Sequence, residues 1–270
     1  MAPLKKIILT LADFFLIDNF GSKVLKFFAG LGESSILLYF SVKNFRYISR
    51  DRKLILEQML NVGVNSIPLV IVTATFCGMV SAVQAGYQLQ GVASPSVLLG
   101  SATSRAIVIE LGPVLTGLVI SGRFGASIAA EIGTMRVTEQ IDALEILAID
   151  PIRYLATPRV IAGIIMMPML IIFADAIAIG GSLFIGFSTM DVAPQAFFSS
   201  IQRFMELRDL ISGLVKALLF GASTALVGCY VGFGTEGGAE GVGQSTIKAF
   251  VLCSAAILVN DYIVASIFLS

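Results

Sequence analysis

Five charged side chains interrupt apolar stretches of the chain: Arg105, Glu110, Asp175, Lys216 and Asp261. A charge inside a lipid-embedded segment is costly, so such a residue usually faces a partner or a cavity. We count depth at about 1.5 Å per residue from the end of each apolar run that lies on the outer side of the membrane. On this count Lys216 and Asp261 lie roughly 10–12 Å deep, and Asp175 and Arg105 roughly 14–15 Å. We expect these four to form one paired structural layer, with Lys216 and Asp261 as the closest couple. A proton relay is the alternative.

Glu110 differs from the other four. It lies roughly 22 Å along its run, where no partner is evident. It precedes Gly112-Pro113, which interrupts helical hydrogen bonding. Arg105 is about 140° away around an α-helix and should not share its face. We therefore expect Glu110 to line a cavity.

The composition places these residues in membrane helices. The chain is 56% hydrophobic and 13% charged, against about 25% charged residues in soluble proteins. The run between Glu57 and Arg105 holds 47 residues without a charge, and about 20 suffice to cross a bilayer. We predict an all-α integral membrane protein. It has no His, no C-x-x-C and no Gly-Lys pair of a phosphate-binding loop, so we expect no catalytic residue, metal site or cofactor, and any ATP must be bound by another chain.

Five transmembrane helices are predicted, at about 62–86, 95–121, 160–186, 209–232 and 248–269. They form one domain, 59–270, in which 122–159 connects the second and third spans. Residues 1–58 read as amphipathic helices lying in the membrane interface, with a single span near 27–42 as the alternative. Segments on one side hold 14 Lys and Arg, and those on the other hold two. This bias predicts a cytoplasmic N-terminus and a C-terminus on the outer side.

The connecting segment carries apolar residues at helical spacing over 126–150. It is long for a passive connection. We expect a cytoplasmic helix, or helix pair, that docks a soluble partner; a solvated loop is the alternative. Two series of small residues, Gly117 to Gly133 and Gly213 to Ala225, recur every fourth position and permit close helix packing. They fit packing within the chain or a subunit interface.

Several motifs resemble those of the MlaE-type permease family, the membrane subunits of ABC transporters that work with MCE-domain proteins. The motifs are Glu110-Leu-Gly-Pro113, Gly122-Arg-Phe-Gly125, the run from Ala130 to Leu144 followed by Asp150-Pro151, and the glycine-rich stretch 237–243. The resemblance covers about 55–269.

The resemblance implies a homodimer with about five spans per subunit, an N-terminal interfacial helix and a cytoplasmic coupling helix. It further implies two cytoplasmic ATPase subunits, an MCE-domain protein on the outer side and, in some systems, a STAS-domain protein. The implied substrate is a phospholipid moved between inner and outer membranes, with no nucleic acid involved. The implied location is a bacterial inner membrane, or the plastid inner envelope.

The resemblance also assigns residues. Glu110 and Leu111 become substrate-binding candidates. Some members carry Arg directly before the Glu, where this chain has Ile109, and Arg105 is the candidate to replace it; head-group choice stays open. The ATPase-coupling candidates are Glu131, Met135, Arg136, Glu139 and Asp142. Two functions from other classes compete: a proton-coupled secondary transporter using Arg105, Glu110 and Asp175, and a non-transporting membrane scaffold.

Overall fold

The computed structural model describes residues 30, 32, 35–40, 43–44, 51–89 and 95–269, and these contain helices and no strand. The prediction of an all-α membrane protein is confirmed. Within the described ranges, five helices are long and apolar enough to cross a membrane: Arg52–Gln88, Leu98–Val137, Ile152–Met190, Leu207–Phe233 and Gly238–Phe268. Most of the predicted interfacial region, 1–58, lies outside the described residues.

Several of these long helices consist of consecutive segments. The elements in chain order are α2 (Arg52–Val62), η2 (Val64–Ser66), α3 (Ile67–Gln88), α4 (Pro95–Ala106), η3 (Ile107–Leu111), α5 (Gly112–Ile120), η4 (Ser121–Gly125), α6 (Ala126–Val137), α7 (Gln140–Ile146), η5 (Ile152–Ala156), α8 (Thr157–Met190), α9 (Pro194–Phe204), α10 (Leu207–Phe233) and α11 (Gly238–Leu269).

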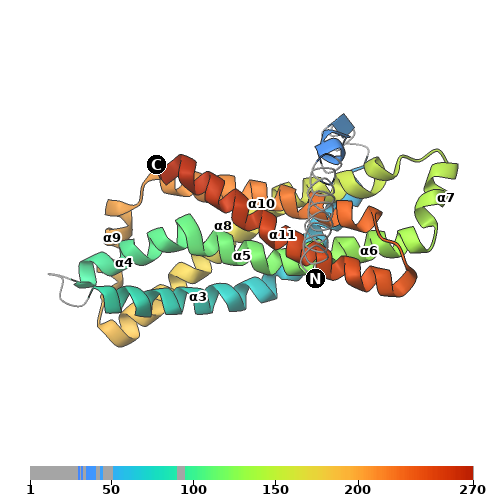
Figure 1. The fold of residues 1–270 in the computed structure, drawn as a ribbon. Coiled ribbons are helices and arrows are strands. Elements are labelled where there is room, and N and C mark those ends of the chain that lie inside the picture. Colours follow the sequence, from blue (N-terminus) through green and yellow to red (C-terminus); the bar gives the residue numbers. More distant parts are fainter. Residues whose placement is uncertain are drawn as a thin grey trace, which may run out of the picture.

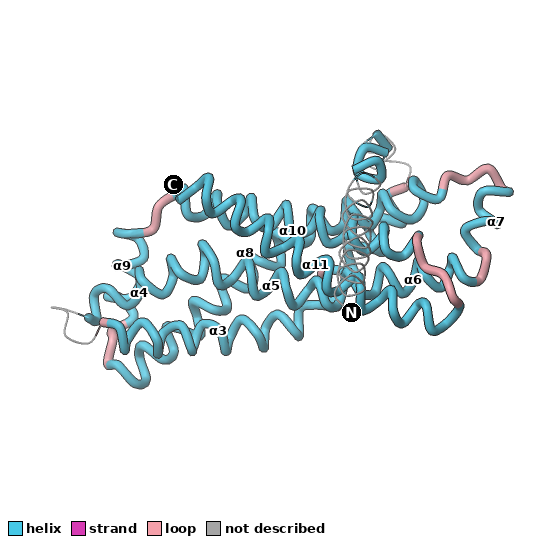
Figure 2. The backbone as a smooth tube through the Cα atoms, in the orientation of Figure 1, coloured by secondary structure: helices cyan, strands magenta, loops and turns pink. Residues whose placement is uncertain are grey.

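The long helices run side by side along one axis, and the described loops lie at the two ends (Figures 1 and 2). One end carries α9, the start of α4 and the end of α11; we call it the α9 end. The opposite end carries α6 and α7, and we call it the α7 end. Helix α8 is central: it packs on α2, α3 and α10, and α10 packs in turn on α6 and α11.

The helices extend beyond the predicted spans. Helix α11 begins ten residues before the predicted start at 248, and α6 continues the second span instead of forming a separate loop helix. The physical reason is that a charged residue ends an apolar run without breaking the backbone hydrogen bonds of a helix. The separate helix of the connecting segment is therefore only α7.

Three short segments, η3, η4 and η5, are π-helical. The first follows from the sequence, because Pro113 has no N–H to give to the carbonyl of Ile109, four residues earlier. The N–H of Gly112 bonds to the carbonyl of Ile107 instead, across five residues. Such a π turn accommodates one additional residue within a helix.

Both series of small residues pack inside the chain. Gly163 of α8 and Gly221 of α10 approach so closely that a Cβ on either would overlap the other's carbonyl. A Cβ on Gly213 would crowd the carbonyl of Val108, and one on Gly125 would crowd Cys253. These glycines let the backbones of neighbouring helices touch, so both series contribute to packing within the chain.

Candidate functional site

Lys216 is the centre of a charged cluster within the bundle. Its side chain has no exposed surface, and its Nζ lies 2.5 Å from Glu110 Oε2 and 2.7 Å from Asp261 Oδ1. The expected contact between Lys216 and Asp261 is therefore made. The expectation that Glu110 has no partner is wrong, because Lys216 reaches it as well.

The backbone explains why a lysine lies here. Lys216 Nζ also donates a hydrogen bond to the carbonyl of Ile109, at 3.0 Å. Pro113 leaves this carbonyl without its usual helical donor, and an unpaired carbonyl in an apolar setting is costly. An ammonium carries three N–H donors, and here it meets two carboxylates and one carbonyl. Gly112-Pro113 and Lys216 thus act as one structural unit.

The members of the cluster differ in accessibility. The side chain of Glu110 is 45% exposed, that of Asp261 is 12% exposed and that of Lys216 is completely covered. A molecule approaching from outside the chain therefore meets the Glu110 carboxylate rather than the ammonium. With both acids ionised, two negative charges face one positive charge.

Arg105 pairs with a residue that the sequence interpretation missed. Its Nε lies 2.9 Å from Asp209 Oδ2, and its Nη2 donates to Asp209 Oδ1 at 3.2 Å. The expectation that Arg105 pairs within one charged layer that includes Asp175 is therefore wrong. Asp209 also accepts the backbone N–H of Glu206 and so caps α10. The Glu206-x-x-Asp209 spacing at the helix start was the available signal.

Depth counting failed because the helix ends are staggered. Asp209 is the third residue of α10, whereas its partner Arg105 is the eleventh residue of α4. A depth measured from the end of one helix is therefore not shared by its neighbour.

Arg105 and Glu110, both in the second span, also share a face of their helix. Asp209 and Lys216, which Arg105 and Glu110 contact, are two turns apart on one side of α10. The expectation that Arg105 and Glu110 point in different directions is wrong, because the π turn η3 absorbs one residue. Their angular separation falls from about 140° to about 40°.

Asp175 and Leu111 lie apart from the cluster. Asp175 Oδ1 is buried without a hydrogen-bond partner in the described part of the chain and lies against Gly112. Leu111 lines a cavity of about 10 Å³ beside Cys77, just enough for one water molecule. No hydrogen bond or ion pair between described residues joins Arg105, Glu110 and Asp175, the three members of the relay in the alternative hypothesis of a secondary transporter.

The five coupling candidates divide into two groups. Glu131 accepts a hydrogen bond from the buried Arg159 at 2.8 Å, and Met135 packs against the apolar core, so both are engaged within the chain. The other three lie on the surface at the α6–α7 corner. There Arg136 Nη1 lies 2.7 Å from Asp142 Oδ1, and Glu139 has a left-handed φ of 59° immediately before α7.

Two large apolar side chains are exposed at the end of α7, and the sequence interpretation placed Leu147 only on the apolar face of the segment and did not consider Ile146. Ile146 is 86% exposed and Leu147 is 68% exposed. Two adjacent apolar residues at the end of an otherwise amphipathic segment were the available signal. Exposed apolar side chains beside polar ones are typical of a contact with another protein.

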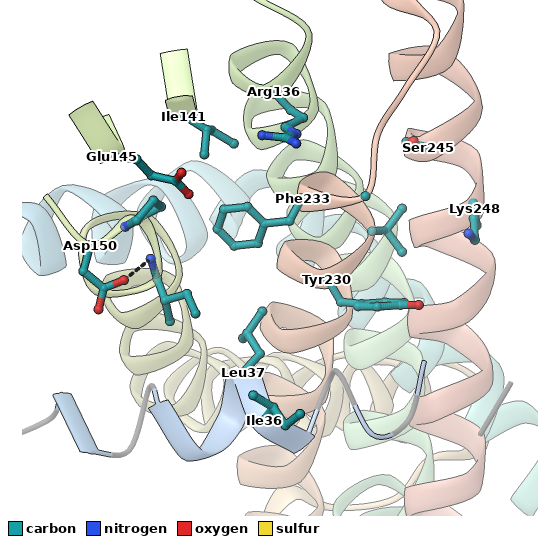
Figure 3. Close-up of a pocket in the computed structure, with 14 residues that line it drawn as sticks. Ile36, Leu37, Arg136, Ile141, Glu145, Asp150, Tyr230, Phe233, Ser245 and Lys248 are labelled. Atoms are coloured by element: carbon teal, nitrogen blue, oxygen red, sulfur yellow. Dashed lines mark hydrogen bonds between the residues drawn. The ribbon is translucent and has the colours of Figure 1, made fainter. Parts of the chain in front are cut away.

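A sizeable cavity lies behind α7, away from the charged cluster. It measures about 640 Å³, and Ile36, Leu37, α6, α7 and the facing ends of α10 and α11 enclose it. Figure 3 shows Phe233 projecting into its middle, with Arg136 and Glu145 on one side. Along α10, Tyr230 at this cavity is about 21 Å from Lys216. Among the described elements, helix α7 packs chiefly on α6.

Two arginines tie the α7 end together. Arg123, in η4, donates to the carbonyl of Asn61 at 3.2 Å and to Ser66 Oγ. Arg153, in η5, makes a two-pronged contact with Asp51 at 3.0–3.1 Å. These contacts join the start of the first long helix to the second and third.

Fold and site together define a class of protein. Three of the five long apolar helices contribute side chains to one charged cluster, and the described residues hold no group of His, Cys, Asp and Glu that could bind a metal ion. The sequence lacks a phosphate-binding loop. The five apolar helices and the charged cluster between them are the features of a multi-pass membrane protein.

Comparison with known proteins gives the family. The family model described as Permease MlaE matches residues 55–267. The chain is 39% identical over 251 residues to a probable ABC transporter permease protein of Rickettsia felis, covering 93% of this chain and 96% of that protein. It is 33% identical over 252 residues to the intermembrane phospholipid transport system permease protein MlaE of Haemophilus influenzae, covering 93% and 96%.

A plant protein is also similar. The chain is 34% identical over 213 residues to protein TRIGALACTOSYLDIACYLGLYCEROL 1, chloroplastic, of Arabidopsis thaliana, covering 79% of this chain and 61% of that protein. The chain belongs to the MlaE permease family. It is a non-catalytic permease subunit of an ABC transporter, whose ATPase activity lies in a partner chain.

Proposed function

We propose that this chain is the permease subunit of an ABC transporter that moves phospholipid between inner and outer membranes. In this proposal it forms a homodimer in a bacterial inner membrane, with two ATPase subunits at the α7 end and an MCE-domain protein at the α9 end. The α7 end then lies in the cytoplasm and the C-terminus in the periplasm. A STAS-domain protein is an optional further partner, and a plastid inner envelope is the alternative location.

The observation that carries the proposal is the half-exposed carboxylate of Glu110 in a span otherwise surrounded by apolar helices. A carboxylate in contact with lipid chains is costly, so its exposed side needs a polar surrounding. A cavity shared by two copies of the chain supplies one. A cavity with a polar point and apolar walls suits an amphiphile better than an inorganic ion.

The α7 end supports the coupling part of the proposal. The exposed side chains of Ile146 and Leu147 offer an apolar contact to the ATPase, while Arg136, Glu139 and Asp142 surround it with charge. The cavity behind α7 leaves it room to move. Since α6 continues directly into the span that carries Glu110 and only the turn at Thr138 and Glu139 separates it from α7, movement of α7 can be passed through α6 to the lipid site.

A tag on the chain and native mass spectrometry of the gently extracted complex test the proposal. We expect two permeases, two ATPases, an MCE-domain protein and retained phospholipid. Glu110→Ala should lower lipid retention and transport while assembly stays intact. Glu57→Ala, the same change at an exposed position on α2, is the matched control.

Two results would contradict the proposal. Wild-type lipid retention and transport by the Glu110→Ala complex would remove Glu110 from the site. Transport that needs a proton gradient and no ATP would support a secondary transporter instead.

A further inference from the structure

Two side chains of opposite charge are about half exposed between residues 98 and 121 of the second long helix. Glu110 is one, and Arg105, which is 41% exposed, is the other. Their partners, Asp209 and Lys216, are covered almost completely. The surface that a ligand meets therefore offers one cation and one anion, both on the side of the span that faces α10.

Arg105 retains hydrogen-bonding capacity. A guanidinium has five N–H donors, and Asp209 engages only its Nε and Nη2. Arg105 has no other hydrogen bond within the described ranges. Free guanidinium donors suit the oxygens of a phosphate, which form strong charge-assisted hydrogen bonds with arginine.

The Glu110 cluster has the opposite character. Its two carboxylates share one ammonium, and Asp261 lies beside Glu110. When both acids are ionised, one negative charge remains uncompensated. In a region of low dielectric, such a charge favours a cationic group on the ligand.

The spacing of the two residues that hold these charges in place is compatible with one head group. Asp209 and Lys216, the contacts of Arg105 and Glu110, are separated along α10 by about 10 Å. A phosphate and an ammonium joined by a two-carbon linker, with a contact of about 3 Å at each end, span a distance of this order.

We infer that the site selects phospholipids whose head group carries a phosphate and a primary ammonium, of the phosphatidylethanolamine type, over anionic phosphatidylglycerol. The phosphate binds Arg105 and the ammonium binds Glu110. The hydroxyl groups of phosphatidylglycerol can donate hydrogen bonds to the Glu110 carboxylate, but they carry no positive charge and leave the excess negative charge of the cluster uncompensated. This inference rests on the proposed lipid-transport function.

The test uses the intact complex, equilibrated with vesicles of equal phosphatidylethanolamine and phosphatidylglycerol content, and counts retained lipids by native mass spectrometry. We expect phosphatidylethanolamine to be enriched about tenfold over its share of the vesicles. Glu110→Gln should lower the enrichment to about twofold or less while lipid is still retained, whereas Glu110→Asp should keep most of it. Arg105→Gln should lower retention of both lipids. Glu57→Gln is the matched control.

The wild-type measurement alone decides the inference, so a variant that fails to assemble does not obscure it. Retained lipid without enrichment, or with phosphatidylglycerol enriched, would overturn the head-group assignment and leave lipid transport standing. A wild-type complex that retains neither lipid would contradict the proposed function itself.

Discussion

Replacing Lys216 by methionine should destabilise the chain strongly, because three groups lose their common partner. Breaking one member out of a buried ion pair costs about 3–5 kcal/mol, and an unpaired buried carbonyl about 1–3 kcal/mol. These costs overlap, and the exposure of Glu110 reduces its share. We therefore expect a loss of about 3–5 kcal/mol for Lys216→Met.

The triple variant Lys216→Met, Glu110→Gln, Asp261→Asn distinguishes the cost of leaving two carboxylates unpaired from the cost of changing the lysine side chain itself. It removes both uncompensated carboxylates and leaves only the Ile109 carbonyl without a donor, at about 1–3 kcal/mol. The triple variant should therefore be more stable than the single one, although it carries more changes.

Unfolding of the full chain is measured by titrating dodecylmaltoside micelles with sodium dodecyl sulfate. Far-ultraviolet circular dichroism is the readout, since the chain has no Trp. Arg136→Met is the control, because it breaks an ion pair whose partners are both about half exposed, and its cost should stay below about 1 kcal/mol. The reasoning fails if Lys216→Met lies within about 1 kcal/mol of the wild type, or if the triple variant is no more stable than the single.

Three further predictions test other parts of the structure. Gly221→Val should cost at least about 1–3 kcal/mol in the same titration because it collides with Gly163, whereas Gly180→Val, which meets no atom within 4 Å, should not; equal effects would contradict the close contact. Asp175→Asn should leave stability unchanged, because no cation pairs with this carboxyl in the described ranges; a marked loss would reveal a missing ionic partner. Ile146→Glu should abolish co-purification of the ATPase with a stability change within about 0.5 kcal/mol; normal ATPase recovery would move the docking surface elsewhere.

The sequence was sufficient to predict the spanning helices, because long uncharged runs have few structural alternatives. It was also sufficient to predict the contact between Lys216 and Asp261, since both lie at similar distances from the same ends of two adjacent helices. The sequence did not predict the partner of Glu110. That contact depends on how far α4 and α10 are displaced along each other, which is a property of their packing.

The π turn explains a second error. Gly112-Pro113 predicted a break in helical hydrogen bonding, but not that the break would rotate Arg105 toward α10. The sequence did not predict the ion pair of Glu131 with Arg159 either, for a related reason. Its partners belong to different long helices, and spacing along the chain does not show which helices adjoin.

The position of Arg123 has a mechanical consequence for the second long helix. Its bonds to Asn61 and Ser66 fasten this helix to the first at η4, between α5 and α6. From this fulcrum, Glu110 lies about 20 Å in one direction and Val137, at the end of α6, about 21 Å in the other. The two arms of the lever are nearly equal. Tilting about Arg123 therefore moves Glu110 by almost the same distance as the end of α6, in the opposite direction, so this lever transmits displacement without amplifying it.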